Sequence, residues 1–318
     1  MTENGTTTRS GVAFLFPGQG SQRPGMGRDV YETWQDGRAA FDAVSRAMGS
    51  DVAAICFEES GRALASTAAA QPALLAVELA CSAVLRRAGV EPAAVAGHSL
   101  GEFAAWAASA AFAEADVAHL VARRGRLMEQ AAQCHPGAMA AIMGLAPSEV
   151  EELCRDAAGI GLVAPANFNA PEQVVVSGER VAVERAARLA MERGGKSRLL
   201  GVAGGFHSAL MARAAERFAQ SLGEVSAFDP VVPVAANATG DWVRSADEVR
   251  AAAAAQMTSA VLWESCVRRM LEAGIRRFYE VGPGNVLAGL LRRIEPSAEV
   301  MAAGDAESLR RIAGVSHG

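Results

Sequence analysis

The stretch PAAVAGHSLGEFAAWAA, residues 92–108, contains an apolar run, a turn flanked by glycines and an alanine-rich segment in succession. Its centre, Gly97-His98-Ser99-Leu100-Gly101, matches the pattern G-x-S-x-G, with a predicted strand before it and a predicted helix after it. In that setting the serine lies on a sharp turn, and the following helix directs backbone N–H groups toward it. We therefore predict an α/β fold with Ser99 as a nucleophile. The motif alone does not separate an esterase from a transferase.

Further apolar runs lie on both sides of this stretch. VAFLF (Val12 to Phe16) is closed by Pro17-Gly18, and two more runs cover Pro233 to Asn237 and Arg276 to Val281. Continuous apolar runs are typical of strands covered on both faces, as in a parallel sheet. Because helical segments alternate with these runs, the pattern favours an α/β fold.

The middle of the chain has a different order of elements. A strand-like run over 138–145 precedes a helix that we expect to start at Ser148, where Ser148 and Glu151 form a possible capping box. Two strand-like runs (161–168 and 173–178), a helix from about Glu179 to Gly194 and a strand over 196–202 follow. This βαββαβ order is the ferredoxin-like pattern.

The two patterns together predict the domain organisation. We expect a small subdomain at 137–202, inserted into a large discontinuous subdomain that comprises 10–136 and 203–305. Residues 1–9 and 306–318 are predicted to be tails.

Composition excludes several classes of protein. The chain has 318 residues, 51% of them hydrophobic, and a net charge of -5, so it predicts a large core and no footprint for nucleic acid or an anionic membrane. It has no run of about 18 uncharged apolar residues and no hydrophobic segment of a signal peptide near its start. Its five cysteines are odd in number and widely spaced, which indicates reduced thiols. We therefore expect a cytoplasmic protein.

A nucleophilic serine needs a base, and one histidine is better placed than the others. His207, in GGFHS (204–208), lies where the chain leaves the predicted small subdomain and re-enters the large one. A substrate cleft is expected between two subdomains, so we predict His207 as the base. His98 adjoins the serine and is more consistent with a structural role or a pocket wall. The remaining three are placed in a solvated helix face, a loop and the chain end: His119, His135 and His317.

Arg124 lies on an unexpected face of a predicted helix. At about 100° per residue it shares the apolar stripe of that helix, whose other members are Leu120, Leu127, Met128 and Ala131. A buried guanidinium must be paired because it does not lose its proton, and its planar fork suits a carboxylate. The partner could be an internal Asp or Glu, or it could be a carboxylate of the substrate.

Six motifs in order resemble the malonyl-CoA:acyl-carrier-protein transacylases and the related acyltransferase domains of polyketide synthases. The resemblance covers about residues 10–300. The motifs are PGQGSQ (17–22), GHSLGE (97–102), Arg124-Gly125, NFNAPEQVVVSG (167–178), GGFHSALM (204–211) and EVGPGNVLAGL (280–290). The resemblance implies an α/β-hydrolase-like large subdomain with an inserted ferredoxin-like subdomain.

The resemblance also implies roles for individual residues. Ser99 would be the nucleophile, His207 the base and Arg124 the group that binds the malonyl carboxylate. The backbone N–H groups of Gln19 and Leu100 would form the oxyanion hole. A main-chain carbonyl, matched here to Gln256, would orient the histidine. Pocket or supporting positions are Gln71, His98, Asn169, Gly205, Phe206 and Asn285.

The reaction implied is ping-pong transfer of malonyl from coenzyme A, through a Ser99 ester, to the phosphopantetheine thiol of an acyl carrier protein. It needs no metal or redox cofactor, and we expect a monomer. Malonyl is favoured because Phe206 adjoins the base and Leu100 follows the serine. Gly205 and Trp106 depart from the family pattern and are predicted to enlarge or reshape the acyl pocket, so methylmalonyl or a longer extender stays open.

Two other functions remain as alternatives. An acyl hydrolase that acts on carrier-bound acyl groups has no use for a carboxylate-binding arginine, so Arg124 favours the transferase. A non-catalytic module that docks on a carrier protein would leave Ser99 inert. The sequence does not distinguish fatty acid synthesis from polyketide synthesis.

Overall fold

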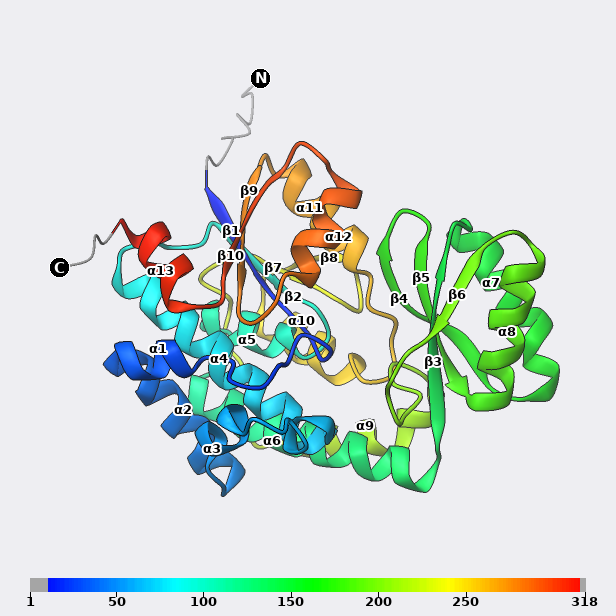
Figure 1. The fold of residues 1–318 in the computed structure, drawn as a ribbon, viewed down its shortest axis with the longest axis horizontal. Coiled ribbons are helices and arrows are strands. Elements are labelled where there is room, and N and C mark those ends of the chain that lie inside the picture. Colours follow the sequence, from blue (N-terminus) through cyan, green and yellow to red (C-terminus); the bar gives the residue numbers. More distant parts are fainter. Residues whose placement is uncertain (1–10, 315–318) are drawn as a thin grey trace.

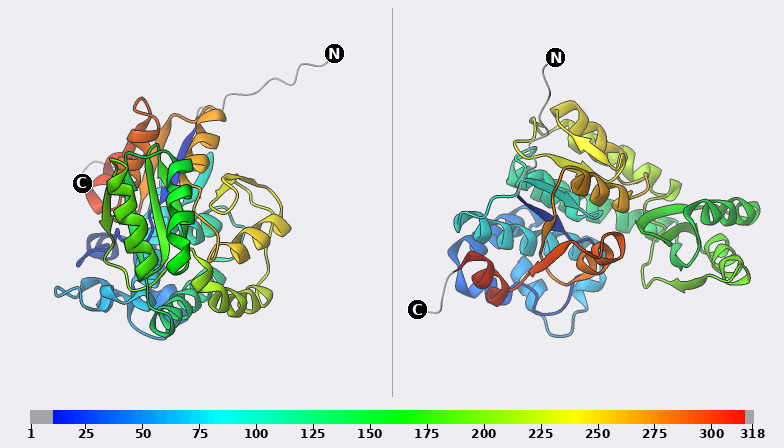
Figure 2. Two further views of the ribbon diagram at one scale, coloured as in Figure 1. Left: turned by 90° about the vertical axis from the view of Figure 1, so that its right-hand side faces the viewer. Right: turned by 90° about the horizontal axis from the view of Figure 1, so that it is seen from above.

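The computed structural model describes residues 11–314, which form two β-sheets and the helices packed on them (Figure 1). The predicted tail at 1–9 and His317 lie outside the described residues. The larger sheet and most of the helices form one body. The smaller sheet projects from it with two helices of its own (Figure 2).

The larger sheet has six strands in the order β10-β9-β1-β2-β7-β8. All neighbouring strands are parallel except β7 and β8, which pair in antiparallel fashion. The predicted apolar runs supply its centre. The strands are β1 (Val12–Phe16), β2 (Ala94–Gly97), β7 (Val234–Ala236), β8 (Asp241–Val243), β9 (Arg277–Val281) and β10 (Glu299–Ala303).

Both faces of this sheet are covered, which explains the uninterrupted apolar run of β1. Phe14 and Phe16 point into the larger core, whereas Ala13 and Leu15 point into the opposite one. The second core is covered by α11 (Trp263–Glu272) and α12 (Val286–Ile294). The helices that contribute to the larger core are α1 (Arg28–Thr33), α2 (Gln35–Met48), α3 (Val52–Phe57), α4 (Thr67–Arg87), α5 (Gly101–Ala108), α6 (Glu114–Cys134), α9 (Ala212–Gly223), α10 (Ala246–Ala255) and α13 (Ala306–Ala313), with the short turns η1 (Ala63–Ala65) and η3 (Ala209–Met211).

The smaller sheet is antiparallel, with the strand order β4-β5-β3-β6. Along the chain its elements run β-α-β-β-α-β, and all of them fall within residues 137–202. The elements are β3 (Gly137–Met143), α7 (Pro147–Ala157), η2 (Ala158–Ile160), β4 (Val163–Ala170), β5 (Gln173–Glu179), α8 (Arg180–Glu192) and β6 (Lys196–Leu199).

The predicted start of α7 was wrong by one residue. The helix begins at Pro147, and the carboxylate of Glu149 accepts from the Ala146 backbone N–H at 2.7 Å. Proline is well tolerated in the first turn, where its missing N–H has no helical partner. The cap is therefore formed by Ala146 and Glu149, and the predicted Ser148–Glu151 capping box does not form.

The two sheets are joined near the carboxyl ends of the large sheet's strands. Val261 bridges to β4 through two backbone bonds: its N–H donates to Ala166 O at 2.8 Å, and its carbonyl accepts from Phe168 N–H at 2.9 Å. Helices α11 and α12 also contact β4. This junction holds the smaller sheet beside the turn that carries Ser99.

The prediction of a tail from residue 306 was wrong, because α13 is a packed helix. Asp305 caps it by accepting from the Ser308 backbone N–H at 2.8 Å, and Leu309 is fully buried. The backbone N–H of Ala306 also donates to the Asp29 carboxylate at 2.6 Å, which ties the helix to α1.

Burial also decides the interpretation of α4 and of the cysteines. Helix α4 is long and apolar enough to cross a membrane by length and composition, but 89% of its most apolar window is buried inside the protein, as in the core helix of a globular protein. All five cysteines are free thiols, and four of them are buried, whereas Cys134 at the end of α6 is exposed.

Candidate active site

Ser99 lies on a strained turn between β2 and α5. Its φ of +53° lies in the left-handed region, which non-glycine residues rarely adopt. The turn requires glycine at two positions. A Cβ on Gly97 would lie 1.9 Å from the carbonyl carbon of Gly101, and one on Gly101 would lie 2.2 Å from Phe16 O. The backbone therefore fixes the position of the serine.

His207 lies within hydrogen-bond distance of this serine, with Nε2 2.7 Å from Ser99 Oγ. Its Nδ1 faces two main-chain carbonyls, Gln256 O at 3.0 Å and Ser259 O at 3.2 Å. Carbonyl oxygens only accept, so Nδ1 carries the proton and Nε2 is left to accept the hydroxyl proton of the serine. His207 also has a positive φ, +56°.

Burial keeps this base neutral. It lowers the pKa of His207 from its ordinary 6.5 to about 3, and the positive charge of Arg124 acts in the same direction. The two carbonyl acceptors oppose the shift by stabilising the protonated ring. At neutral pH the imidazole is therefore free to accept a proton.

Arg124 is fully buried beside the nucleophile. Its Nη2 lies 3.3 Å from Ser99 Oγ, and the guanidinium lies over the ring of Phe103, 5.5 Å from the centroid. Its other hydrogen-bond acceptors are neutral amides: Gln71 Oε1 accepts from Nη1 at 2.7 Å, and Gln256 Oε1 accepts from Nη2 at 2.8 Å. Burial lowers the pKa of Arg124 to about 10, which is still well above neutral, so the guanidinium stays charged at neutral pH.

Gln256 makes hydrogen bonds to several groups of the site. Its side-chain Nε2 donates to Ser99 O at 2.5 Å and to Glu102 Oε2 at 2.9 Å, while its Oε1 accepts from Arg124. Its main-chain carbonyl accepts from His207. One residue therefore contacts the nucleophile's backbone, the base and the arginine.

The loop with Gln19 lies against the turn with Ser99. A Cβ on Gly18 would lie 2.4 Å from His98 O, so only glycine allows this approach. In the described part of the chain, the backbone N–H groups of Gln19 and Leu100 donate to no protein acceptor. Both are thus available as donors to an oxyanion.

The remaining predicted positions differ in how near they lie to this centre. His98 Nε2 donates to Asn169 Oδ1 at 2.8 Å, and its ring packs on Trp263 at 5.5 Å between centroids. These contacts give His98 a supporting place and link Ser99's neighbour to β4. Asn285 is exposed at the start of α12 and makes no side-chain cap there.

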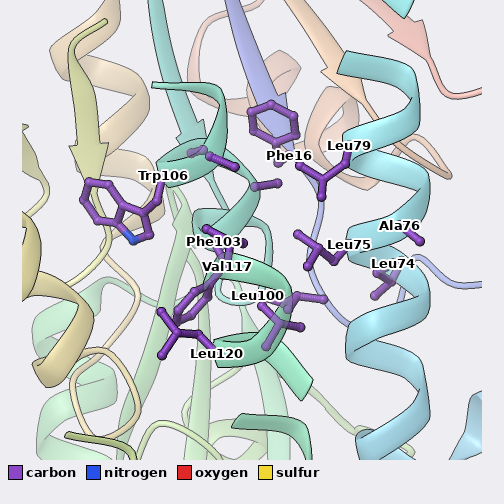
Figure 3. Packing of buried hydrophobic residues seen from close by; sticks show 14 of the residues in the cluster. Phe16, Leu74, Leu75, Ala76, Leu79, Leu100, Phe103, Trp106, Val117 and Leu120 are labelled. Atoms are coloured by element: carbon purple, nitrogen blue, oxygen red, sulfur yellow. The ribbon is translucent and has the colours of Figure 1, made fainter. Parts of the chain in front are cut away.

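The structure shows what surrounds Gly205 and Trp106, the two positions at which the sequence departs from the family pattern. A Cβ on Gly205 would lie 2.8 Å from Leu210 Cδ1 and 2.9 Å from Gly178 O, so other atoms already fill the space that a side chain would take. Trp106 is fully buried in the larger core, among the side chains packed around α5 (Figure 3). Phe206 is buried, as expected for a residue beside the base.

Sequence reasoning missed three groups at the site. Asn237 Oδ1 accepts from Ser99 N–H, and its Nδ2 donates to Gly97 O, both at 2.7 Å. Glu102 is a buried carboxylate that bonds to Asn237 and Gln256, and the Ser259 carbonyl is a second partner of His207. The sequence held two signals: a carboxylate within the apolar segment GEFAAWAA, and an asparagine at the end of a predicted strand.

Comparison with known proteins gives a consistent result. Residues 13–309 match the acyl transferase domain family. The chain is 36% identical over 302 residues to the malonyl CoA-acyl carrier protein transacylase of Bacillus subtilis, covering 94% of this chain and 95% of that one.

Two further matches concern a solved structure and a longer protein. The crystal structure of malonyl-CoA:acyl carrier protein transacylase from Xanthomonas oryzae superposes with a TM-score of 0.92 at 37% identity, covering 98% of this chain and all of that one. The polyketide biosynthesis protein ThaF of Burkholderia thailandensis is 40% identical over 291 residues, but they cover 89% of this chain and only 24% of that protein.

Proposed function

The chain belongs to the acyl transferase domain family, and we propose that it moves malonyl from coenzyme A to the phosphopantetheine thiol of an acyl carrier protein through an ester on Ser99. The donor and the acceptor are those named for its relatives from Bacillus subtilis and Xanthomonas oryzae. The residues that carry the chemistry are Ser99, His207 and Arg124.

The observation that carries the proposal is that the buried guanidinium of Arg124 has no direct carboxylate partner. Among the described residues, no carboxylate lies within the 4.0 Å of a salt bridge with this buried guanidinium. The internal Asp or Glu partner that the sequence left open is therefore missing, and two amides hold the arginine next to Ser99. A charge-assisted pair with a substrate carboxylate supplies the direct ion-pair partner that the guanidinium lacks.

In the acylation step, Ser99 Oγ attacks the thioester carbonyl of malonyl-CoA while His207 Nε2 takes the hydroxyl proton. The backbone N–H groups of Gln19 and Leu100 stabilise the resulting oxyanion. The carbonyls of Gln256 and Ser259 stabilise the imidazolium through Nδ1–H. The carbon–sulfur bond then breaks, and the proton passes from His207 to the leaving thiolate.

The transfer step runs the same sequence in reverse. The thiol of the carrier protein gives its proton to His207 and attacks the malonyl ester of Ser99, and the serine leaves with that proton. Serine and histidine supply the nucleophile and the base, so the chemistry calls for no metal or redox cofactor. We further propose a monomer that acts in the cytoplasm, in either fatty acid or polyketide synthesis.

Four side chains support this centre in the proposal: Gln71, Gln256, His98 and Asn169. Asn285, exposed at the start of α12, stays a predicted pocket position. Because the space beside Gly205 is filled, we favour malonyl over a larger extender. Methylmalonyl stays as the second substrate to be offered.

The experiment is incubation of the protein with malonyl-CoA and a phosphopantetheinylated carrier protein, followed by mass spectrometry of the carrier. Malonyl-carrier protein is the expected product. Free malonate with an unloaded carrier would make the protein a hydrolase. An unmodified Ser99 and no product would make it a docking module.

A further inference from the structure

Glu102 is a fully buried carboxylate that the proposed reaction does not use. It lies in the first turn of α5, three residues after the nucleophile. Its Oε1 accepts from the Asn237 backbone N–H at 2.7 Å, and its Oε2 accepts from Gln256 Nε2 at 2.9 Å. Neither partner is charged, so this carboxylate is removed from water without a direct salt bridge, and burial raises its pKa to about 7.

The first branch of this network leads to the turn that carries Ser99. Asn237 follows β7, and its side chain bonds to both Gly97 O and Ser99 N–H. Glu102 fixes the backbone of the same residue. Glu102 therefore helps to hold the side-chain amide of Asn237 in the position from which it bonds to the turn with Ser99.

The second branch leads to Arg124 through the orientation of one amide. Gln256 directs its NH₂ group at Glu102 and Ser99 O, and its oxygen at Arg124. In the flipped amide, the oxygen would face the carboxylate and the NH₂ group would face the guanidinium, so both contacts would be repulsive. Because both oxygens of Glu102 act as acceptors, its carboxylate selects the amide orientation that gives Arg124 an acceptor.

The separation between the Glu102 carboxylate and the Arg124 guanidinium also affects how Arg124 can bind a substrate. When Glu102 is ionised, its charge opposes the lowering of the Arg124 pKa by burial and so stabilises the cation. Because Gln256 lies between the two charged groups, the carboxylate does not occupy the fork of the guanidinium. The substrate carboxylate can then take that place.

We propose that Glu102 is a positioning residue that sets the Gln256 amide and the Ser99 turn, and thereby presents Arg124 to the carboxylate of the acyl group. This inference rests on the proposed malonyl transfer. Glu102 does not touch the substrate in this account and acts through its two neighbours.

The test compares Glu102→Gln with a matched control, Glu280→Gln. Glu280 is also fully buried and accepts two backbone N–H groups, from Leu287 at 3.0 Å and Ala288 at 2.8 Å, at the start of α12. For each variant kcat and KM would be measured with malonyl-CoA and with acetyl-CoA, together with the thermal unfolding temperature.

In Glu102→Gln we expect kcat/KM for malonyl to fall by about tenfold to a hundredfold, since bonds to a buried charged group are lost or reversed. Acetyl transfer should fall less, because acetyl does not use Arg124, so the ratio of malonyl to acetyl transfer decreases. The Glu280→Gln control should lower the unfolding temperature and leave this ratio at the wild-type value.

An unchanged ratio in a folded Glu102→Gln protein would overturn the inference and leave Glu102 with a structural role. If that variant does not fold, Glu102→Asp replaces it, because the shorter side chain keeps the charge but does not reach both partners. A wild-type ratio in Glu102→Asp would also overturn the inference. A wild-type protein that takes no malonyl would instead overturn the proposed function.

Discussion

The nucleophile and the arginine, 3.3 Å apart, are held in place in two different ways. The position of Ser99 is fixed by backbone: two glycines in contact, a positive φ and the strand and helix on either side. The position of Arg124 is fixed by side chains from distant parts of the chain, Gln71 and Gln256. The reacting half of the site is thus local in sequence, and the recognition half is not.

This difference decides how a substitution acts. A change in the backbone-built half should affect every acyl group, because all of them use the same nucleophile. A change in the side-chain network should affect the acyl groups that carry a carboxylate. Comparing malonyl with acetyl transfer therefore separates the two halves.

Removing the nucleophile should have the largest effect. In Ser99→Ala, transfer of both malonyl and acetyl should fall by on the order of a thousandfold or more, because no covalent ester can form. Intact-protein mass spectrometry after exposure to either thioester should show no adduct. A malonyl adduct on the folded variant would mean that another residue is the nucleophile.

Removing the arginine should lower malonyl transfer without lowering acetyl transfer. In Arg124→Ala we expect malonyl transfer to fall by about a hundredfold, since a buried charge-assisted pair is lost, while acetyl transfer is kept or improved. The readout is kcat/KM for each thioester. Equal losses for both would make Arg124 a structural residue and would remove the distinction between the two halves.

A methyl group added to the turn with Ser99 tests whether a change in the backbone-built half affects both acyl groups equally. In Gly101→Ala the new Cβ would lie 2.2 Å from Phe16 O, so the turn must shift. We expect a loss of about 1–3 kcal/mol in unfolding free energy and equal losses of malonyl and acetyl transfer. Chemical denaturation and the two kcat/KM values measure this, and a selective loss of malonyl transfer would contradict the account.

The sequence indicated the local, backbone-built half of the site more fully than the side-chain network. The apolar runs and G-x-S-x-G predicted the strands, the turn and Ser99, because each signal lies within a few residues. Arg124 was found because a cation on an apolar helix face is a local conflict. Asn237 and Ser259 were missed, since their contacts depend on how distant elements pack. The contacts of Leu210 and Gly178 beside Gly205 were beyond the sequence for the same reason.

A smaller effect is expected from pH. The folded protein holds His207 neutral down to about pH 3, whereas the unfolded chain binds a proton below about pH 6.5, so this residue lowers stability as pH falls through that window. Its activity as a base should nevertheless persist. The rate at which a neutral fluorophosphonate modifies Ser99 should change little between about pH 7.5 and 5.5, where an ordinary histidine would lose about tenfold.

The same pH series in Glu102→Gln gives the control, because burial raises the pKa of Glu102 to about 7. A fall in rate that disappears in this variant belongs to Glu102. A fall of about tenfold that persists in it would mean that His207 titrates near its ordinary pKa, which would contradict the buried neutral base.

The smallest effect should come from the surface of the smaller sheet's helices. Arg193 pairs with Glu152 at 3.2 Å and with Asp156 at 2.8 Å, and all three side chains are substantially exposed. Arg193→Ala should change the unfolding free energy by no more than about 1 kcal/mol and leave both transfer rates unchanged. A change in the ratio of malonyl to acetyl transfer would show that recognition extends to this surface.

The central claim is that Ser99 accepts the acyl group and that Arg124 selects one with a carboxylate. The most direct measurement offers equimolar malonyl-CoA and acetyl-CoA to the wild-type protein, without carrier protein, and identifies the modified peptide by mass. The account predicts one malonyl group on the peptide that contains Ser99 and little acetyl. A predominantly acetylated Ser99, or malonyl on any other residue, would contradict it.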